Sequence, residues 1–335
     1  MSPVAPRGEA DELGRFRRLT GATIIATLIL ILIGGIVRVS DSGLGCGAAG
    51  SGTHGWPLCE GGVVPPGSAE SLIEFSHRAA ATVVSVLILA MVIQAFRRLR
   101  GHRLIVRGSI AAGVLVLAQA ALGGLTVEEG LHEYLVAAHL GLAMLLLGLL
   151  IVVRRSASPG REPVPASRGL RAVTMTATVL VLATIVAGGL VAGTEGMGRP
   201  SEPVLGAHTA CGEQFPACLG RFMPFDEGHL VDIQLTHRLF MYLAAIAVLA
   251  MTAMALRQGI RERAFWIASV ILLCQVLLGA INVWLGEHAG LIVGHLALGT
   301  ILWGTMVAAA GALLPASALA RGDLGRAGPA PAAAA

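Results

Sequence analysis

The sequence predicts an all-α membrane protein in which eight transmembrane helices form two tandem four-helix bundles. Of its 335 residues, 55% are hydrophobic and only 13% are charged, and the mean hydropathy is +0.76. A helix needs about 20 apolar residues to cross the hydrocarbon core of a bilayer. Eight stretches meet this requirement, at about residues 20–38, 72–95, 105–126, 132–153, 172–193, 233–256, 264–285 and 289–313.

The distribution of arginine predicts how these helices are oriented. All basic residues are arginine, and 19 of the 24 lie in the N-terminal tail, in three alternate loops or in the C-terminal tail. The other ends of the stretches carry only Arg38, Arg78, Arg199, Arg221 and Arg238. Basic residues accumulate in cytoplasmic loops, so both termini are expected in the cytoplasm of a bacterial cell. The same bias explains the net charge of +4 without a nucleic-acid partner, and the first stretch is expected to be an uncleaved span.

The chain divides into two repeats of four spans each. Residues 1–18 and 314–335 are expected to be cytoplasmic tails, the first of them polar and disordered, and 154–171 a proline-rich cytoplasmic linker between repeats 19–153 and 172–313. Equivalent residues recur at nearly constant spacing: Gly34-Gly35 returns as Gly188-Gly189 after 154 residues, His77 as His237 after 160, and Gln119 and His139 as Gln275 and His295 after 156. Because four is an even number, the repeats share one orientation and should be related by an axis along the membrane normal.

The cysteines fit this topology. Cys46 and Cys59 fall in the first outer loop, and Cys211 and Cys218 fall in the third. Cysteine pairs outside the cytoplasm tend to be oxidised, which predicts the disulfides Cys46–Cys59 and Cys211–Cys218. Cys274 stands alone in an apolar stretch and is expected to be a small buried side chain.

Four histidines occupy equivalent places in the second and fourth spans of each repeat. They are His77 and His139 in the first repeat, and His237 and His295 in the second. Each lies roughly 7–11 Å below the outer start of its predicted helix. Two imidazoles at matched depth on parallel helices can ligate a flat metal complex from both faces, as in haem proteins. An interhelical hydrogen bond is the simpler interpretation of one membrane histidine, but four at repeated positions favour iron ligation.

The other histidines are weaker candidates. His132 and His288 lie seven residues before two of the four, nearer to water, where they could contact haem propionates or have no ligand role. His208 and His229 lie in outer loops and could transfer protons or gate access. Two more are expected to be solvated: His54 and His102.

An acidic residue distinguishes the two repeats. Glu74 lies one helical turn before His77, whereas the second repeat keeps the His237-Arg238 pair without the acid. A carboxyl group beside a bound ring could exchange protons during a reaction, but a carboxylate paired with Arg78 at the helix end is an equal alternative. Arg78 and Arg238 could extend to the membrane interface or contact haem propionates.

These residues together resemble the haem A synthase family. The matching features are Gly34-Gly35 with Arg38, Ser42-Gly43, Cys46, Trp56-Pro57-x-Cys59, Glu74-x-x-His77, His139, His237 and His295. The resemblance covers all eight predicted spans. It implies an oxidoreductase that converts haem O to haem A for cytochrome c oxidase. The C8 methyl of the ring would become a formyl group through two successive hydroxylations and the loss of water.

The resemblance also implies a role for each half. His77 and His139 would hold the substrate haem O, His237 and His295 would hold a haem b cofactor, and Glu74 would be catalytic. Haem O synthase and the assembly of cytochrome c oxidase are the implied partners, beside the lipid bilayer. The family's outer-loop cysteines are closer together, and the glycine-rich insert 47–55 between Cys46 and Cys59 is expected to be a flexible loop.

Two other functions share parts of this pattern. A bis-histidine membrane cytochrome with two haems b would use the same four histidines to move electrons without modifying a haem. A transporter with a four-span repeat would use them to relay protons. Pigment analysis separates the three, because only the first yields a modified haem and the transporter binds none.

Overall fold

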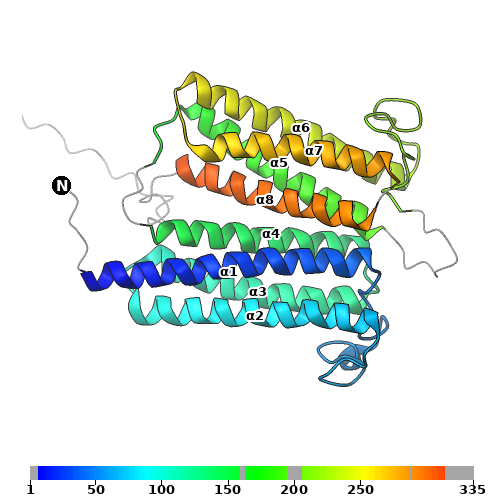
Figure 1. Cartoon of the computed structure of the whole chain (residues 1–335), viewed down its shortest axis with the longest axis horizontal. Helices are drawn as coiled ribbons and strands as arrows, with labels where there is room; N and C mark the ends of the chain where they lie inside the picture. Colours follow the sequence, from blue (N-terminus) through cyan, green and yellow to red (C-terminus); the bar gives the residue numbers. More distant parts are fainter. Residues whose placement is uncertain (1–6, 159–162, 195–205, 287, 314–335) are drawn as a thin grey trace, which may run out of the picture.

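The computed structural model describes residues 7–158, 163–194, 206–286 and 288–313, and within them it contains eight long α-helices (Figure 1). Their bounds are α1 Arg7–Val39, α2 Ala69–Arg98, α3 Arg103–Glu128, α4 Glu133–Ser156, α5 Arg168–Gly193, α6 His229–Arg257, α7 Arg263–Trp284 and α8 Ala289–Leu313. All eight are long and apolar enough to cross a membrane. The prediction of an all-α protein with eight spans is therefore confirmed.

Local sequence explains where helices begin and how they satisfy their polar groups. Ser68 and Ser167 cap α2 and α5, and each hydroxyl accepts a hydrogen bond from a backbone N–H three residues later. Inside the spans, threonine hydroxyls donate to the carbonyl four residues earlier, as at Thr23 and Thr27 of α1. These bonds matter because a lipid environment offers no water to polar side chains.

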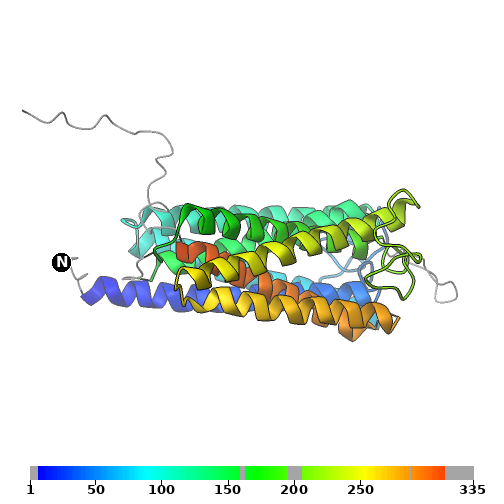
Figure 2. The ribbon, with the colours of Figure 1, turned by 90° about the horizontal axis from the view of Figure 1, so that it is seen from above.

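The helices pack as two groups of four. Helices α1–α4 contact one another in a ring, and α5–α8 do the same, while α4 packs on α5 and α1 and α4 pack on α8 (Figure 1). Seen from above, all eight run along the same long axis (Figure 2). The start of α1 and the end of α8 lie at one end of the molecule, and both disulfide-bearing loops lie at the other (Figure 1). This arrangement is compatible with the two predicted bundles.

Matching contacts join the two groups. The site of a side chain at Gly35 in α1 lies 2.6 Å from Leu296 in α8, and the equivalent Gly189 in α5 lies 3.1 Å from Leu140 in α4. These contacts exchange when the repeats are exchanged, which is compatible with a twofold relation between the groups. Arg38 adds a link at the outer end, where its Nε donates to the carbonyl of Ala192 at 2.8 Å.

Three sequence-based expectations need correction or lie outside the structure. Helix α1 begins at Arg7, so residues 7–18 are helical rather than disordered, because Leu13 and Phe16 pack into the core of the first group. Cys274 is exposed on α7 rather than buried. The C-terminal tail 314–335, part of the linker and Arg199 lie outside the described residues.

Candidate functional site

The four predicted ligand histidines occupy matched positions on their helices. His77 and His237 are the ninth residues of α2 and α6, and His139 and His295 are the seventh residues of α4 and α8. At 1.5 Å per residue they lie about 12 Å and 9 Å along their helices from the outer end. Within each group the two histidines lie within range of each other's charge, His77 and His139 in the first and His237 and His295 in the second. The structure thus brings together the predicted pairs.

The imidazoles have the chemistry that iron ligation requires. The Nδ1 of His237 donates to the carbonyl oxygen of Thr184 at 3.0 Å. A carbonyl can only accept, so the proton of the neutral ring is on Nδ1 and the lone pair of Nε2 is left for a metal. The Nδ1 atoms of His77, His139 and His295 are buried and complete no hydrogen bond among the described residues. The two rings of each pair therefore fit the axial positions of a haem.

The part of the chain that the structure describes forms no metal site made of protein ligands alone. Among the described residues, no three histidine, cysteine, aspartate or glutamate side chains converge as a metal cage would require. Two axial histidines suffice for haem, because the porphyrin supplies the other four nitrogen ligands. Pairs of histidines without further protein ligands are what a bis-histidine haem site needs.

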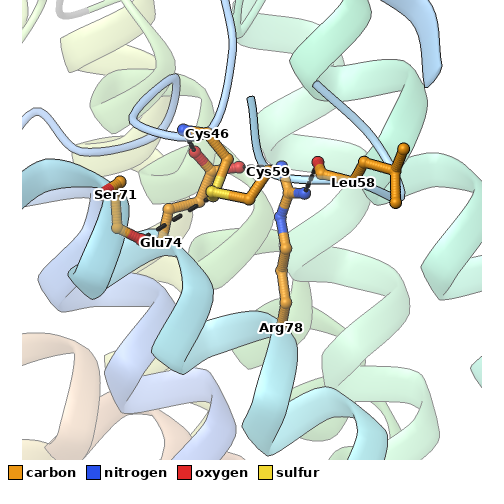
Figure 3. Close-up of polar contacts among 6 residues, drawn as sticks. All are labelled: Cys46, Leu58, Cys59, Ser71, Glu74 and Arg78. Carbon is orange, nitrogen blue, oxygen red and sulfur yellow. Dashed lines mark hydrogen bonds and ion pairs between the residues drawn. A yellow bond between two sulfur atoms is a disulfide. The ribbon is translucent and has the colours of Figure 1, made fainter. Parts of the chain in front are cut away.

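Glu74 is buried one turn above His77 and is held by the first outer loop (Figure 3). Its Oε2 accepts a hydrogen bond from the backbone N–H of Cys46 at 2.7 Å, and its Oε1 accepts one from Arg78. Arg78 also donates to the carbonyl of Leu58 at 2.8 Å. The pairing with Arg78 that the sequence suggested is present. The Cys46 N–H binds the carboxylate directly, and Arg78 links it to Leu58, so both ends of the loop that the disulfide closes hold it.

The second group has the same arginine without the acid. Arg238 donates to the carbonyls of Ala217 and Gln214 at 2.8 and 2.9 Å and lies over the ring of Phe215, 5.5 Å from its centroid. Arg78 and Arg238 therefore both anchor an outer loop. Contact of either residue with a haem propionate stays a prediction.

The residue that replaces Glu74 in the second group is Gln234. It follows Glu74 by 160 residues, the same spacing that relates His77 to His237, and it is buried. The spacing of 160 residues identifies this amide from the sequence, where the missing acid is the more obvious difference. An uncharged isostere thus stands where the first group has a carboxylate.

Both predicted disulfides are formed. Cys46 is bonded to Cys59 and Cys211 to Cys218. The insert 47–55, expected to be a flexible loop, is folded: it contains a short 3₁₀ turn at Gly52–His54, and the backbone N–H of Gly52 donates to the Glu128 side chain of α3 at 3.0 Å.

The other histidines lie away from the ligand pairs. His132 precedes α4 beside Tyr134 and Glu133, and His288 is exposed before α8. His208 is partly buried in the third outer loop, and there burial and then the charge of Arg38 lower its pKa. His229 and His54 are exposed, as expected for His54. His102 is partly exposed and contacts Glu9 at 2.9 Å.

Comparison with known proteins places the chain in a family. Residues 17–307 match the model of the family described as cytochrome oxidase assembly protein. The chain is 27% identical over 293 residues to a haem A synthase of Halalkalibacterium halodurans, covering 85% of this chain and 92% of that protein. It is 30% identical over 270 residues to one of Exiguobacterium sibiricum, covering 78% and 82%. It is also 33% identical over 207 residues to one of Alkalihalophilus pseudofirmus, covering 60% and 64%. The chain therefore belongs to the cytochrome oxidase assembly protein family, and within it to the haem A synthases.

Proposed function

We propose that this protein oxidises haem O to haem A in the first helix group and holds a haem b cofactor in the second. His77 and His139 would ligate the substrate, and His237 and His295 the cofactor. Similarity to named haem A synthases supports the overall reaction. The assignment of the halves rests on one observation: Glu74 is a buried carboxylate one turn from His77, and its counterpart beside His237 is the amide of Gln234.

Glu74 would handle protons beside the substrate ring. Overall, a methyl group and one water give a formyl group, four protons and four electrons; the electrons pass to an external electron acceptor, so a group at the site must accept and return the protons. A carboxylate can do this, whereas the amide of Gln234 cannot. Arg78 and the Cys46 N–H would hold Glu74 in one orientation, because each donates to a different carboxylate oxygen. The remaining lone pairs of those oxygens are the ones that would accept a proton.

The second helix group would supply electron transfer. A bound haem b supplies one-electron chemistry there. The chain's own contribution would be to hold the ring between two imidazoles, with the amide of Gln234 in place of a carboxylate beside it. Thr184 would orient His237 through its carbonyl, while Arg238 holds the third outer loop closed above the site. Such fixed surroundings suit a cofactor that stays bound through many turnovers.

The proposed topology sets the place of the reaction. The arginine distribution puts both termini in the cytoplasm, which would place the four histidines near the outer face of a bacterial cell membrane. Haem O would arrive from haem O synthase, and haem A would leave toward cytochrome c oxidase assembly.

Pigment analysis tests the function directly. The chain is expressed in a host that supplies haem O, with a haem A synthase of H. halodurans in parallel, and the extracted haems are separated by chromatography. We expect formyl haem, with hydroxymethyl haem as an intermediate. Absence of both products beside an active control would contradict the proposal. Reversible haem b spectra without product would indicate an electron-transfer cytochrome, and protein without haem absorption would indicate a transporter.

A further inference from the structure

Each ligand histidine rests against a glycine of the helix that precedes its own. The position that a Cβ would take at that glycine lies close to the imidazole Cε1. The distance is 3.0 Å from Gly34 to His77, 3.1 Å from Gly123 to His139, 3.0 Å from Gly188 to His237 and 2.8 Å from Gly279 to His295. Real Cβ atoms rarely or never approach another heavy atom so closely. No residue with a side chain would fit at these four sites without moving the ring.

The four rings face their glycines with the same edge. In every case Cε1 is the ring atom nearest to the Cβ position, Nδ1 is second at 3.2–3.7 Å, and Nε2 is third at 3.6–3.9 Å. The Cε1 corner of each ring is therefore turned into the gap above the glycine, and Nδ1 is the nearer of its two nitrogen neighbours. The same order recurs at all four contacts.

A backbone carbonyl accompanies the gap. The Nδ1 of His237 donates to the carbonyl of Thr184, four residues before Gly188. The backbone of Leu30 and Gln275, four residues before Gly34 and Gly279, lies near the rings of His77 and His295, although the Nδ1 atoms of these rings complete no hydrogen bond. In a helix the Cα–Cβ bond leans back over the preceding turn, so a side chain at these glycines would cover that carbonyl.

We infer that Gly34, Gly123, Gly188 and Gly279 are positioning residues for haem ligation. The missing side chain makes room for the Cε1 corner of each imidazole, which fixes the rotation of the ring and with it the direction in which Nε2 would face the iron. The inference rests on the proposed function, because it takes the four histidines as ligands. Groups that orient a metal-bound histidine commonly change metal affinity 10–100-fold when they are altered.

Glycine at these sites opposes helix propensity. Alanine is the better helix former, so an interior glycine needs a compensating reason. Close packing is the common one in membrane helices, and it applies elsewhere in this chain: Gly141 faces Val186 at 3.0 Å and Gly148 faces Trp303 at 3.1 Å. Those glycines serve as controls, because they are crowded by ordinary side chains rather than by ligands.

The cofactor half offers the sharper experiment. Gly188→Ala and Gly279→Ala are purified with their haem, beside two control variants. Gly294→Ala changes the residue next to His295, where a Cβ meets only Leu278 at 3.6 Å, and Gly141→Ala crowds a site without a histidine. Haem b per folded protein and the low-spin electron paramagnetic resonance spectrum are measured. We expect Gly188→Ala and Gly279→Ala to lose haem affinity about 10–100-fold or to shift their g values. Gly294→Ala should match the wild type, and Gly141→Ala should keep the wild-type spectrum.

A double variant keeps the test decisive if Gly188→Ala does not fold. Gly188→Ala combined with His237→Ala removes the ring that the new methyl group would strike. We expect the double variant to recover the folded yield of His237→Ala alone, and failure to recover would overturn the inference. The inference would also be overturned if Gly188→Ala and Gly279→Ala kept the wild-type haem content and spectrum, or if they lost no more haem than Gly141→Ala. Unchanged haem in His237→Ala and His295→Ala would contradict the proposed function instead.

Discussion

The two helix groups differ most at the point where each outer loop meets its second helix. In the first group, Arg78 bridges the Glu74 carboxylate and a loop carbonyl, and the carboxylate also holds the Cys46 N–H. In the second group, Arg238 bonds two loop carbonyls directly, and the neighbouring Gln234 carries no charge. The same loop anchor is therefore built with a buried acid in one group and without one in the other.

This difference shows that the acid is not needed to close the loop. Arg238 achieves that with backbone acceptors alone, so a buried carboxylate at Glu74 is an added cost that structure does not require. The histidines show a second contrast: among the four, His237 completes a hydrogen bond to a carbonyl, whereas the Nδ1 atoms of the other three complete none among the described residues. A substrate site must release its haem, whereas a cofactor site must keep it, and the one imidazole held in this way lies in the proposed cofactor half.

The largest expected effect comes from removing an axial histidine in one half at a time. His237→Ala should abolish both haem b binding and conversion, because the iron loses a ligand and the electron path is lost. His77→Ala should abolish conversion but leave the haem b spectrum of the purified protein. Optical spectra and haem extraction distinguish the variants, and equal loss of haem b in both would contradict the division of roles.

The second test exchanges the acid for its counterpart. Glu74→Gln gives the first group the residue of the second, and we expect conversion to fall about 10²–10⁴-fold because proton transfer is lost. Bound haem should remain, since the histidines are unchanged. Product formation per bound haem is the measurement. Near-normal turnover in Glu74→Gln would remove this carboxylate from the mechanism and favour its role as a structural partner of Arg78.

The third test compares the two loop anchors. Arg78→Ala leaves the buried Glu74 carboxylate without its cation, and breaking a buried pair costs about 3–5 kcal/mol. Arg238→Ala loses hydrogen bonds to carbonyls and leaves no charge behind, so we expect about 1.5–3 kcal/mol. In thermal unfolding in detergent, Arg78→Ala should therefore have a lower Tm than Arg238→Ala. Arg221→Ala, in an exposed pair with Glu227, is the control with little effect; a reversed ranking would contradict the buried-pair argument.

The smallest effect concerns pH at the third outer loop. Burial and the charge of Arg38 lower the pKa of His208 below its ordinary value of about 6.5. The unfolded chain thus binds this proton more readily than the folded one, so stability is complete above about pH 6.5 and falls as pH drops further. His208→Asn should lose less Tm between pH 7 and pH 5, by roughly a degree or two. Exposed His54→Asn should match the wild type, and an equal response would count against burial of His208.

Much of the fold could be predicted from sequence because a membrane imposes simple requirements. Span length and repeat spacing predicted eight helices, and cysteines in predicted outer loops predicted the disulfides Cys46–Cys59 and Cys211–Cys218. Helix α1 was underestimated at its start, since hydropathy does not register a polar helical turn that buries only Leu13 and Phe16. The prediction that Cys274 is buried was wrong, because an apolar span in lipid exposes residues that a water-soluble protein would bury.

The sequence by itself determined the spans, the repeat and the residue types of the site, because periodicity and spacing are properties of the chain alone. Tertiary structure decided what those residues touch. Only packing of α1 on α2 and of α5 on α6 brings Gly34 to His77 and Gly188 to His237, and only loop closure brings Cys46 to Glu74. Such contacts depend on how segments far apart in the chain pack in space, and the spacing of residues along the sequence does not specify that packing.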